Sequence, residues 1–358
     1  ATLAGSAVEA AINPALESNF EKELASKRIP LPLPTRPAFT AVPIGRADTV
    51  TVPAGYNVQV IHRWGDPITG SYPAYRDGGL NTAEEQAQQV GQNTDGMHWF
   101  PVYEQDPNQR GLLVVNHEYI DEAKLHPNGP TRVNGNRPAE EVRKEINAHG
   151  VSVAEYARGA DGQWALVRGS YNRRITGATP MEITGPARGH PKLVTRYSPT
   201  GTMTRGTLNN CAHGYTLWGT YLTCEENWAG YFVNRDPAAS RPREHTRYGV
   251  PSSNSRYGWE TAGASPTDEF VRFNCSATGA SAAADYRNEV NGQGWVVEID
   301  PYNADSVPKK RTALGRFAHE GAFFSPPRLG EPLAYYMGDD SQNEYVYKFV
   351  TRGVWNPF

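Results

Sequence analysis

The stretch 209–228 carries a dense set of side chains that could do chemistry. It reads Asn-Asn-Cys-Ala-His-Gly-Tyr-Thr-Leu-Trp-Gly-Thr-Tyr-Leu-Thr-Cys-Glu-Glu-Asn-Trp. Tyr215–Thr223 has the β-branched and aromatic composition of strand, broken by glycine, and predicts a hairpin. In an antiparallel pair the start of one strand lies beside the end of the next, so we expect Cys211, His213 and Glu225 at one sheet edge. A thiol, an imidazole and carboxylates together indicate a mixed metal site, with thiolate for a transition metal and carboxylates for calcium.

The same residues also allow a purely structural interpretation. Free cysteines are among the most buried residues and mostly act as small core side chains. A Glu-Glu pair at a strand end is commonly just solvated. The stretch alone therefore leaves both interpretations open.

Acidic residues follow apolar strands at three places in the chain. The runs at 113–118, 221–226 and 335–340 each end in an acidic cluster. They are spaced by roughly two β-propeller blades of about 40–50 residues. We therefore expect an all-β fold, a six-bladed β-propeller that is incomplete in this chain, with a few short helices and long loop insertions. The acidic strand ends would converge on a central funnel, where calcium would neutralise them. A two-sheet sandwich would give similar local signals.

Composition excludes several classes of protein. The chain has 358 residues, with 35 Gly, 28 Pro and 19 Tyr, which favours short strands joined by turns. The net charge of -3 argues against a nucleic-acid partner. No apolar run approaches the length of a membrane span, so none is expected. Three cysteines leave at least one unpaired, which argues against a disulfide framework.

The two ends of the chain suggest a division into segments. Residues 8–27 predict a helix and residues 30–37 a proline-rich extended arm. We expect residues 1–48 to wrap a propeller domain at 49–358. The start at Ala1 fits a mature end left after signal removal. The end at Phe358 directly follows a strand-like run, so we expect a truncated propeller that a second chain could complete.

Several long motifs together resemble the PhoX-type alkaline phosphatases. The resemblance spans about residues 49–350, most of the chain. Its motifs are Gly206–Ala212, Trp218–Trp228, Leu314–Gly321 and Tyr336–Phe349, with Asn116–Tyr119 and Thr184–Ala187 in the same pattern.

This resemblance implies a β-propeller with a central site holding iron and calcium. It implies a periplasmic or secreted bacterial enzyme, exported folded by the twin-arginine route, that releases phosphate from small organic esters. By position, Cys211 would be the thiolate ligand of iron and Glu320 would bind or bridge the metals. The resemblance further implies that the calcium ligands are Glu118, Glu225 and Asp340, with an amide oxygen from Asn209 or Asn210.

Two residues depart from the family pattern. His319 stands where these phosphatases tend to carry arginine, and His213 stands where a small or amide residue is usual. Arginine there would clamp a phosphate with two hydrogen bonds, whereas histidine does so only when protonated, or ligates metal instead. Candidates to hold the ester are Arg188, Arg316 and His319, although each arginine could equally serve in a structural ion pair.

Two other functions remain compatible with the sequence. A calcium-bound propeller could serve as a binding module without turnover. A propeller hydrolase of another class, such as a lactonase, would use one calcium ion and need no thiolate. Metal content and the behaviour of a Cys211 variant would separate these from a metal-dependent phosphatase.

Overall fold

The computed structural model describes residues 39–357. The chain divides into two compact units, Ala1–Val60 and Ile61–Phe358. In the described part of the first unit, the rings of Phe39 and Tyr56 pack edge to face at 5.6 Å. The helix predicted at 8–27 and the proline-rich arm at 30–37 lie outside the described residues, so the predicted domain at 1–48 stays a prediction.

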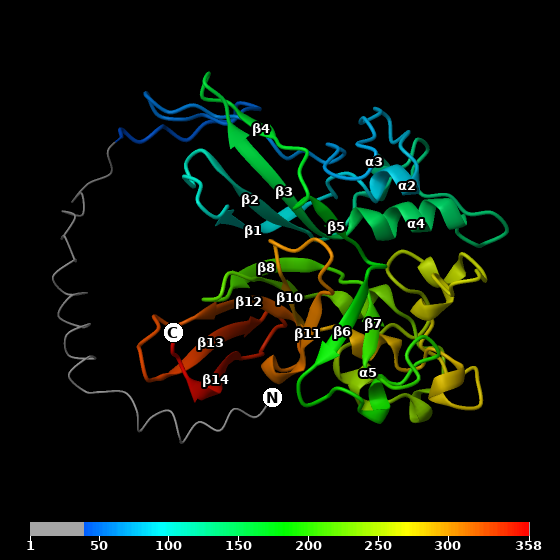
Figure 1. Ribbon diagram of the computed structural model, residues 1–358. Coiled ribbons are helices and arrows are strands. Elements are labelled where there is room, and N and C mark those ends of the chain that lie inside the picture. Colours follow the sequence, from blue (N-terminus) through cyan, green and yellow to red (C-terminus); the bar gives the residue numbers. More distant parts are fainter. Residues whose placement is uncertain (1–38, 358) are drawn as a thin grey trace. The chain divides into compact units, whose positions relative to one another are not determined.

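The first sheet of the second unit is an antiparallel meander (Figure 1). Its strands follow the order β1-β2-β3-β4, and β5 pairs with β3 beyond the end of β4. Their bounds are β1 Thr94–Pro101, β2 Arg110–His117, β3 Gly150–Arg158, β4 Trp164–Leu166 and β5 Arg173–Ile175.

The central sheet has six strands in the order β7-β6-β11-β10-β9-β8. All pairs are antiparallel except β6 with β11, which are parallel. The predicted hairpin is confirmed as β8 and β9, and Cys211 and His213 lie within β8 rather than before it. The bounds are β6 Pro180–Thr184, β7 Met203–Arg205, β8 Asn210–Tyr215, β9 Tyr221–Glu225, β10 Val296–Ile299 and β11 Lys309–Arg311.

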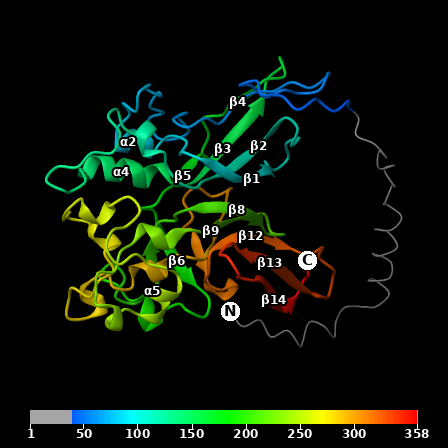
Figure 2. The ribbon, with the colours of Figure 1, turned by 180° about the vertical axis from the view of Figure 1, so that it is seen from behind.

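The third sheet has the order β12-β13-β14 and lies next to β8 (Figures 1 and 2). Its bounds are β12 His319–Phe324, β13 Pro332–Asp339 and β14 Val346–Val354. Gly214 of β8 lies directly against β12. A Cβ at this glycine would sit 1.8 Å from the carbonyl oxygen of Ala322, so only glycine permits this approach.

All three sheets share one arrangement at the same end. Each sheet has an edge strand, β1, β8 or β12, that starts beside the end of the strand paired with it, β2, β9 or β13. The paired residues are Thr94 with His117, Asn210 with Glu225, and His319 with Asp339. These three edge strands are also neighbours, because β8 contacts both β1 and β12.

The expected all-β class is confirmed, since strands dominate and the described helices are short. The three acidic motifs lie at the ends of β2, β9 and β13, each of which pairs with an edge strand of its sheet. The six-bladed propeller stays a prediction, because the described strands form three open sheets.

The longest described helix is α4, Ala139–Ala148. The others are α2 Ala83–Gln86, α3 Glu122–Leu125 and α5 Arg243–Arg247. Among residues 39–357, no helix is long and apolar enough to cross a membrane.

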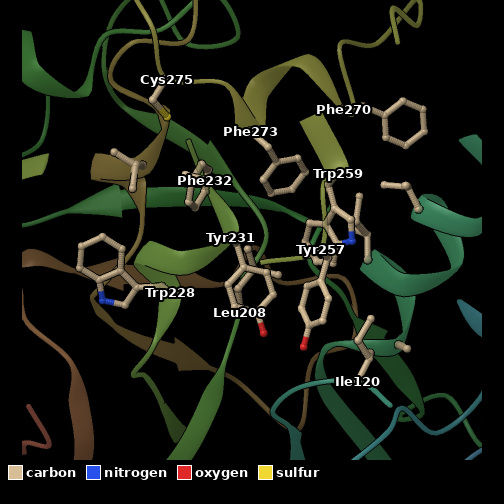
Figure 3. Packing of buried hydrophobic residues seen from close by; sticks show 14 of the residues in the cluster. Ile120, Leu208, Trp228, Tyr231, Phe232, Tyr257, Trp259, Phe270, Phe273 and Cys275 are labelled. Carbon is tan, nitrogen blue, oxygen red and sulfur yellow. The ribbon is translucent and has the colours of Figure 1, made fainter. Parts of the chain in front are cut away.

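Residues between β9 and β10 form a long irregular insertion of the kind expected from the sequence. It is held by an aromatic core that also receives residues from α4 (Figure 3). Burying a large aromatic side chain stabilises the fold by roughly 1.5–3 kcal/mol, which allows a region poor in regular structure to stay ordered. The aromatic members are Trp228, Tyr231, Phe232, Tyr257, Trp259, Phe270 and Phe273.

Candidate metal centre

A thiol and two carboxyl groups meet where the first and central sheets touch. Asp95 of β1, Glu118 just after β2, and Cys211 of β8 place one ligand atom each within 4.8 Å of one another. Asp95 forms hydrogen bonds with both Glu118 and Cys211. The three residues come from two sheets, so the contact between β1 and β8 sets their spacing.

Three more carboxyl groups continue this group into the third sheet. Cys211 Sγ lies 3.4 Å from Glu320 Oε1, on the first strand of that sheet. Asp340, just beyond β13, forms hydrogen bonds with both Glu320 and Glu226. We call Asp95, Glu118, Cys211, Glu226, Glu320 and Asp340 the acidic cluster.

Crowding of like charges shows in the pKa values of the cluster. Burial and Asp95 raise the pKa of Glu118 to about 7. Burial and the hydrogen bond to Asp340 raise the pKa of Glu226 to about 8. Burial and Asp95 also raise the pKa of the Cys211 thiol. These groups would ionise together only with a strong positive charge among them, which is what a bound cation provides.

Asn116 fixes the strands beneath the cluster. Its amide donates to the carbonyl oxygens of Cys211 and Ala212, at 2.6 and 3.1 Å. Its own carbonyl oxygen accepts from Tyr221 Oη and Thr223 Oγ1, at 3.0 and 2.8 Å. Because Asn116 is fully buried, these bonds join β2, β8 and β9 rigidly and hold Cys211 in place.

Glu225, expected as a calcium ligand, lies outside the cluster. Its carboxylate is fully buried and forms an ion pair with Lys310 of β11. It also accepts from the backbone N–H groups of Gly294 and Trp295, at 2.9 and 3.0 Å. Its lone pairs are thus used by the fold, and the next residue, Glu226, takes the expected place in the cluster.

Two other predicted ligands have different surroundings. Asn210 is fully buried and donates to Thr207 and Thr223, while its carbonyl oxygen has no hydrogen-bond partner. That oxygen is therefore free to serve as a ligand. His213 lies among aromatic rings and stacks on Tyr221 at 5.6 Å. Burial lowers the pKa of His213 to about 4, so this imidazole is neutral near pH 7.

The predicted ester-holding residues do not gather at the cluster. His319 is fully buried, stacks on Phe317 at 3.6 Å, and pairs through Nε2 with the carbonyl oxygen of Gly315. Arg316 donates to two backbone carbonyl oxygens and lies over the ring of Trp228 at 4.3 Å. Arg188 donates to backbone carbonyls and pairs with Glu182. The structure thus gives all three fold-supporting contacts.

Sequence reasoning missed Asp95 and Glu226. Glu226 stands beside the residue chosen, and strand alternation through β9 separates the two side chains. Asp95 lies in the irregularity between Thr94 and Met97, where the regular β1–β2 register is interrupted, and its carboxyl group lies close to that of Glu118. The position of this irregularity, which the local sequence does not reveal, was the signal needed.

Comparison with known proteins decides the family. Residues 37–358 match the family described as Alkaline phosphatase PhoX. The chain belongs to the alkaline phosphatase PhoX family. The resemblance seen in its motifs is thereby confirmed. A search among curated proteins found no match.

A solved PhoX structure is similar to this chain. It is Pseudomonas fluorescens PhoX in complex with vanadate, a transition-state analogue. The two share 39% sequence identity with a TM-score of 0.77, over 89% of this chain. The present chain covers 51% of that PhoX chain, so it spans about half the length of the structure it matches.

The donor atoms of the acidic cluster fit a mixed metal centre. Five carboxyl groups offer the hard oxygen ligands that calcium prefers, and one thiol offers a soft ligand for a transition metal. The raised pKa values of Glu118 and Glu226 and the unpartnered oxygen of buried Asn210 are the features expected of groups built around a cation.

Proposed function

We propose that this protein hydrolyses phosphate esters of small molecules at the acidic cluster. The observation that carries this proposal is the meeting of one thiol and five carboxyl groups, from three sheets, in a chain of the PhoX family. The vanadate complex of the similar PhoX supports phosphate-ester chemistry for this site too, because vanadate imitates a phosphate under attack.

We propose calcium and iron as the cofactors. Cys211 would bind the iron, while Glu118, Glu226, Asp340 and the amide oxygen of Asn210 would bind calcium. Glu320 would bridge the two kinds of metal ion, because it contacts both Cys211 and Asp340. When bound, such ions neutralise phosphate charge and lower the pKa of a coordinated water.

The chain's own residues hold the proposed metal ligands in position and leave one side of the acidic cluster open to solvent. Asn116 fixes the strand that carries Cys211. The exposed side chains of Glu320 and Asp340 mark the open side through which an ester would enter. Buried Glu226 would stay in place as the ester arrives, since its surroundings restrict its rotamers.

We further propose that the three sheets are consecutive blades of a six-bladed β-propeller. The contacts of β8 with β1 and β12 fit inner strands ranged around an axis. The other blades would come from further polypeptide, such as a second chain. In keeping with the family, we propose a periplasmic or secreted location, reached by twin-arginine export.

Metal analysis and turnover test this function together. We expect the purified protein to contain iron and calcium and to release phosphate from p-nitrophenyl phosphate. Cys211→Ala should lose the iron and reduce kcat by at least about 10²-fold, the scale of losing one charge-stabilising group. Cys275→Ala is the matched control, because that cysteine is buried in the aromatic core.

Three outcomes would contradict the proposal. A Cys211→Ala protein that keeps its iron and its turnover would remove the thiolate from the site. Calcium alone without turnover would indicate a binding module. Turnover of lactones but not phosphates would indicate a hydrolase of another class.

A further inference from the structure

A pocket of about 420 Å³ opens beside the acidic cluster. One of its lining residues, Arg256, shows that the pocket is near the cluster. The guanidinium carbon of Arg256 lies 5.8 Å from the ring centre of Tyr119, the residue after Glu118. The positive charge of Arg256 also reaches Glu118, where it opposes the larger effects of burial and Asp95 on the pKa of that carboxyl. Arg132, Arg137, Arg256, Tyr257, Glu122 and Thr131 line the pocket.

The lining arginines differ in how their charge is used. Arg137 is buried and forms ion pairs with Glu122, Glu141 and Glu145, so it is neutralised within the fold. Among residues 39–357, Arg132 and Arg256 have no carboxylate partner, and the Arg132 side chain donates only to the carbonyl oxygen of Gly135. The pocket thus carries two positive charges with no acidic partner.

Aromatic faces rather than acids hold Arg256. Its guanidinium carbon lies 5.3 Å from the ring centre of Tyr257 and 6.0 Å from that of Tyr231. Both tyrosines belong to the aromatic core, where Tyr257 stacks on Trp259 at 5.6 Å (Figure 3). Cation–π contacts orient a guanidinium without using its N–H groups, so the donors of Arg256 stay free for a ligand.

Gly258 brings the second arginine to the same place. A Cβ at this position would lie 2.6 Å from Arg132 Nη2, and the backbone φ of 71° also favours glycine. The guanidinium of Arg132 therefore rests against the segment that carries Arg256. Two guanidinium groups that line one pocket and form no ion pair within the described part of the chain suit a multiply charged anion such as phosphate, which accepts paired hydrogen bonds.

We propose that this pocket receives the alcohol part of the ester, and that Arg256 and Arg132 bind a second anionic group on it. The inference rests on the proposed function of the acidic cluster and names a substrate class within it. Preferred substrates would carry a second phosphate or a carboxylate in addition to the phosphate that is removed. In this role both arginines position the substrate.

Two matched esters test the preference. Propane-1,3-diyl bisphosphate carries a second phosphate, whereas propyl phosphate has the same carbon chain without it. We expect the wild-type kcat/KM to be at least tenfold higher for the bisphosphate. This tenfold difference is in addition to the factor of two that arises because either of its two phosphates can be removed. Arg256→Ala and Arg132→Ala should each reduce this ratio at least fivefold through KM, with partial rescue by Arg256→Lys.

The matched control is Arg168→Ala. Arg168 also stacks on a tyrosine, Tyr72, at 4.5 Å, and does not line this pocket. This variant should keep the wild-type ratio. Equal losses for both esters in Arg256→Ala, or a ratio near two in wild type, would overturn the inference.

A binding measurement separates this inference from the proposed function. Calorimetry would compare the non-hydrolysable propane-1,3-diyl bisphosphonate with propyl phosphonate. Tighter binding of the bisphosphonate that Arg256→Ala abolishes would support the pocket even if no ester were hydrolysed. Hydrolysis of propyl phosphate with equal affinity for both phosphonates would keep the phosphatase and reject the pocket.

Discussion

At the scale of single residues, the two adjacent glutamates at the end of β9 have opposite roles. Glu225 is buried against Lys310 and two backbone N–H groups, so it holds the central sheet together. Glu226 turns toward Asp340 and joins the acidic cluster. One step along the strand separates a structural ion pair from a proposed ligand.

Neutralising each glutamate should therefore give different phenotypes. Glu225→Gln leaves the Lys310 ammonium buried without a counter-charge, which should lower the free energy of unfolding by about 3–5 kcal/mol. Glu226→Gln should not lower the stability of the metal-free protein, and it should lower the calcium content instead. Urea unfolding in chelator and elemental analysis would measure the two effects.

A compensating change provides the control for this pair. Adding Lys310→Met to Glu225→Gln removes the unpaired charge and should restore part of the lost stability. If Glu225→Gln lost calcium while remaining stable, the assignment of the two glutamates would be reversed.

The sequence made part of this site predictable and hid the rest. Glu118 and Asp340 follow apolar strands, Cys211 stands at the start of the predicted hairpin, and the family resemblance pointed to Glu320. The structure brings these four residues together. Glu225 and Glu226 are chemically identical, and only the burial of Lys310 tells them apart. His319, Arg316 and Arg188 carry suitable chemistry, but their contacts come from distant segments that no local pattern reveals.

At the scale of elements, the approach of β8 to β12 sets the distance between Cys211 and Glu320. Gly214 makes it possible, because a side chain there would overlap the backbone at Ala322. Local composition predicted the strands themselves. It could not predict the parallel pairing of β6 with β11, since strands far apart in sequence form it.

Gly214→Ala should push these two strands apart. We expect a loss of about 1–3 kcal/mol in unfolding free energy, because the overlap is with backbone and no rotamer relieves it. Retained iron should fall as well, since Cys211 and Glu320 separate. Thermal unfolding and elemental analysis would record both.

Gly353→Ala offers the same substitution without the overlap. Gly353 lies on β14, and no atom stands within 4 Å of its added Cβ. This variant should match wild type in both measurements. Wild-type behaviour of Gly214→Ala would show that the strands can adjust without cost.

At the scale of the whole molecule, the crowded carboxyl groups make stability depend on pH and on cations. The folded pKa values of Glu118 and Glu226, about 7 and 8, lie above the ordinary value of 4.5. Ionisation therefore destabilises the metal-free fold as the pH rises from about 4.5 to 8, and the loss is complete above that range. Buried histidines act in the opposite direction: burial lowers the pKa of His149 to about 3, which costs stability below pH 6.5.

Comparing Glu226→Gln with wild type isolates the contribution of the Glu226 carboxyl group to the pH dependence of the unfolding free energy. In chelator, the unfolding free energy of the variant should increase relative to that of wild type as the pH rises from 5 to 9. Saturating calcium should reverse the order, since calcium at 100 times its Kd adds about 2.7 kcal/mol to a protein that binds it only when folded. A difference between the variant and wild type that does not change with pH would contradict the crowding of the carboxyl groups.

The parallel pairing of β6 with β11 also bears on how the molecule is made. β11 must be synthesised before the central sheet can close around β6, and such long-range pairings form slowly because a large loop has to be ordered first. The acidic cluster runs from Asp95 to Asp340, so a growing chain cannot assemble it before Asp340 has been synthesised. Metal ions can therefore fill the site only after Asp340 has been synthesised and the three sheets have formed, and the compartment in which folding finishes decides which ions are inserted.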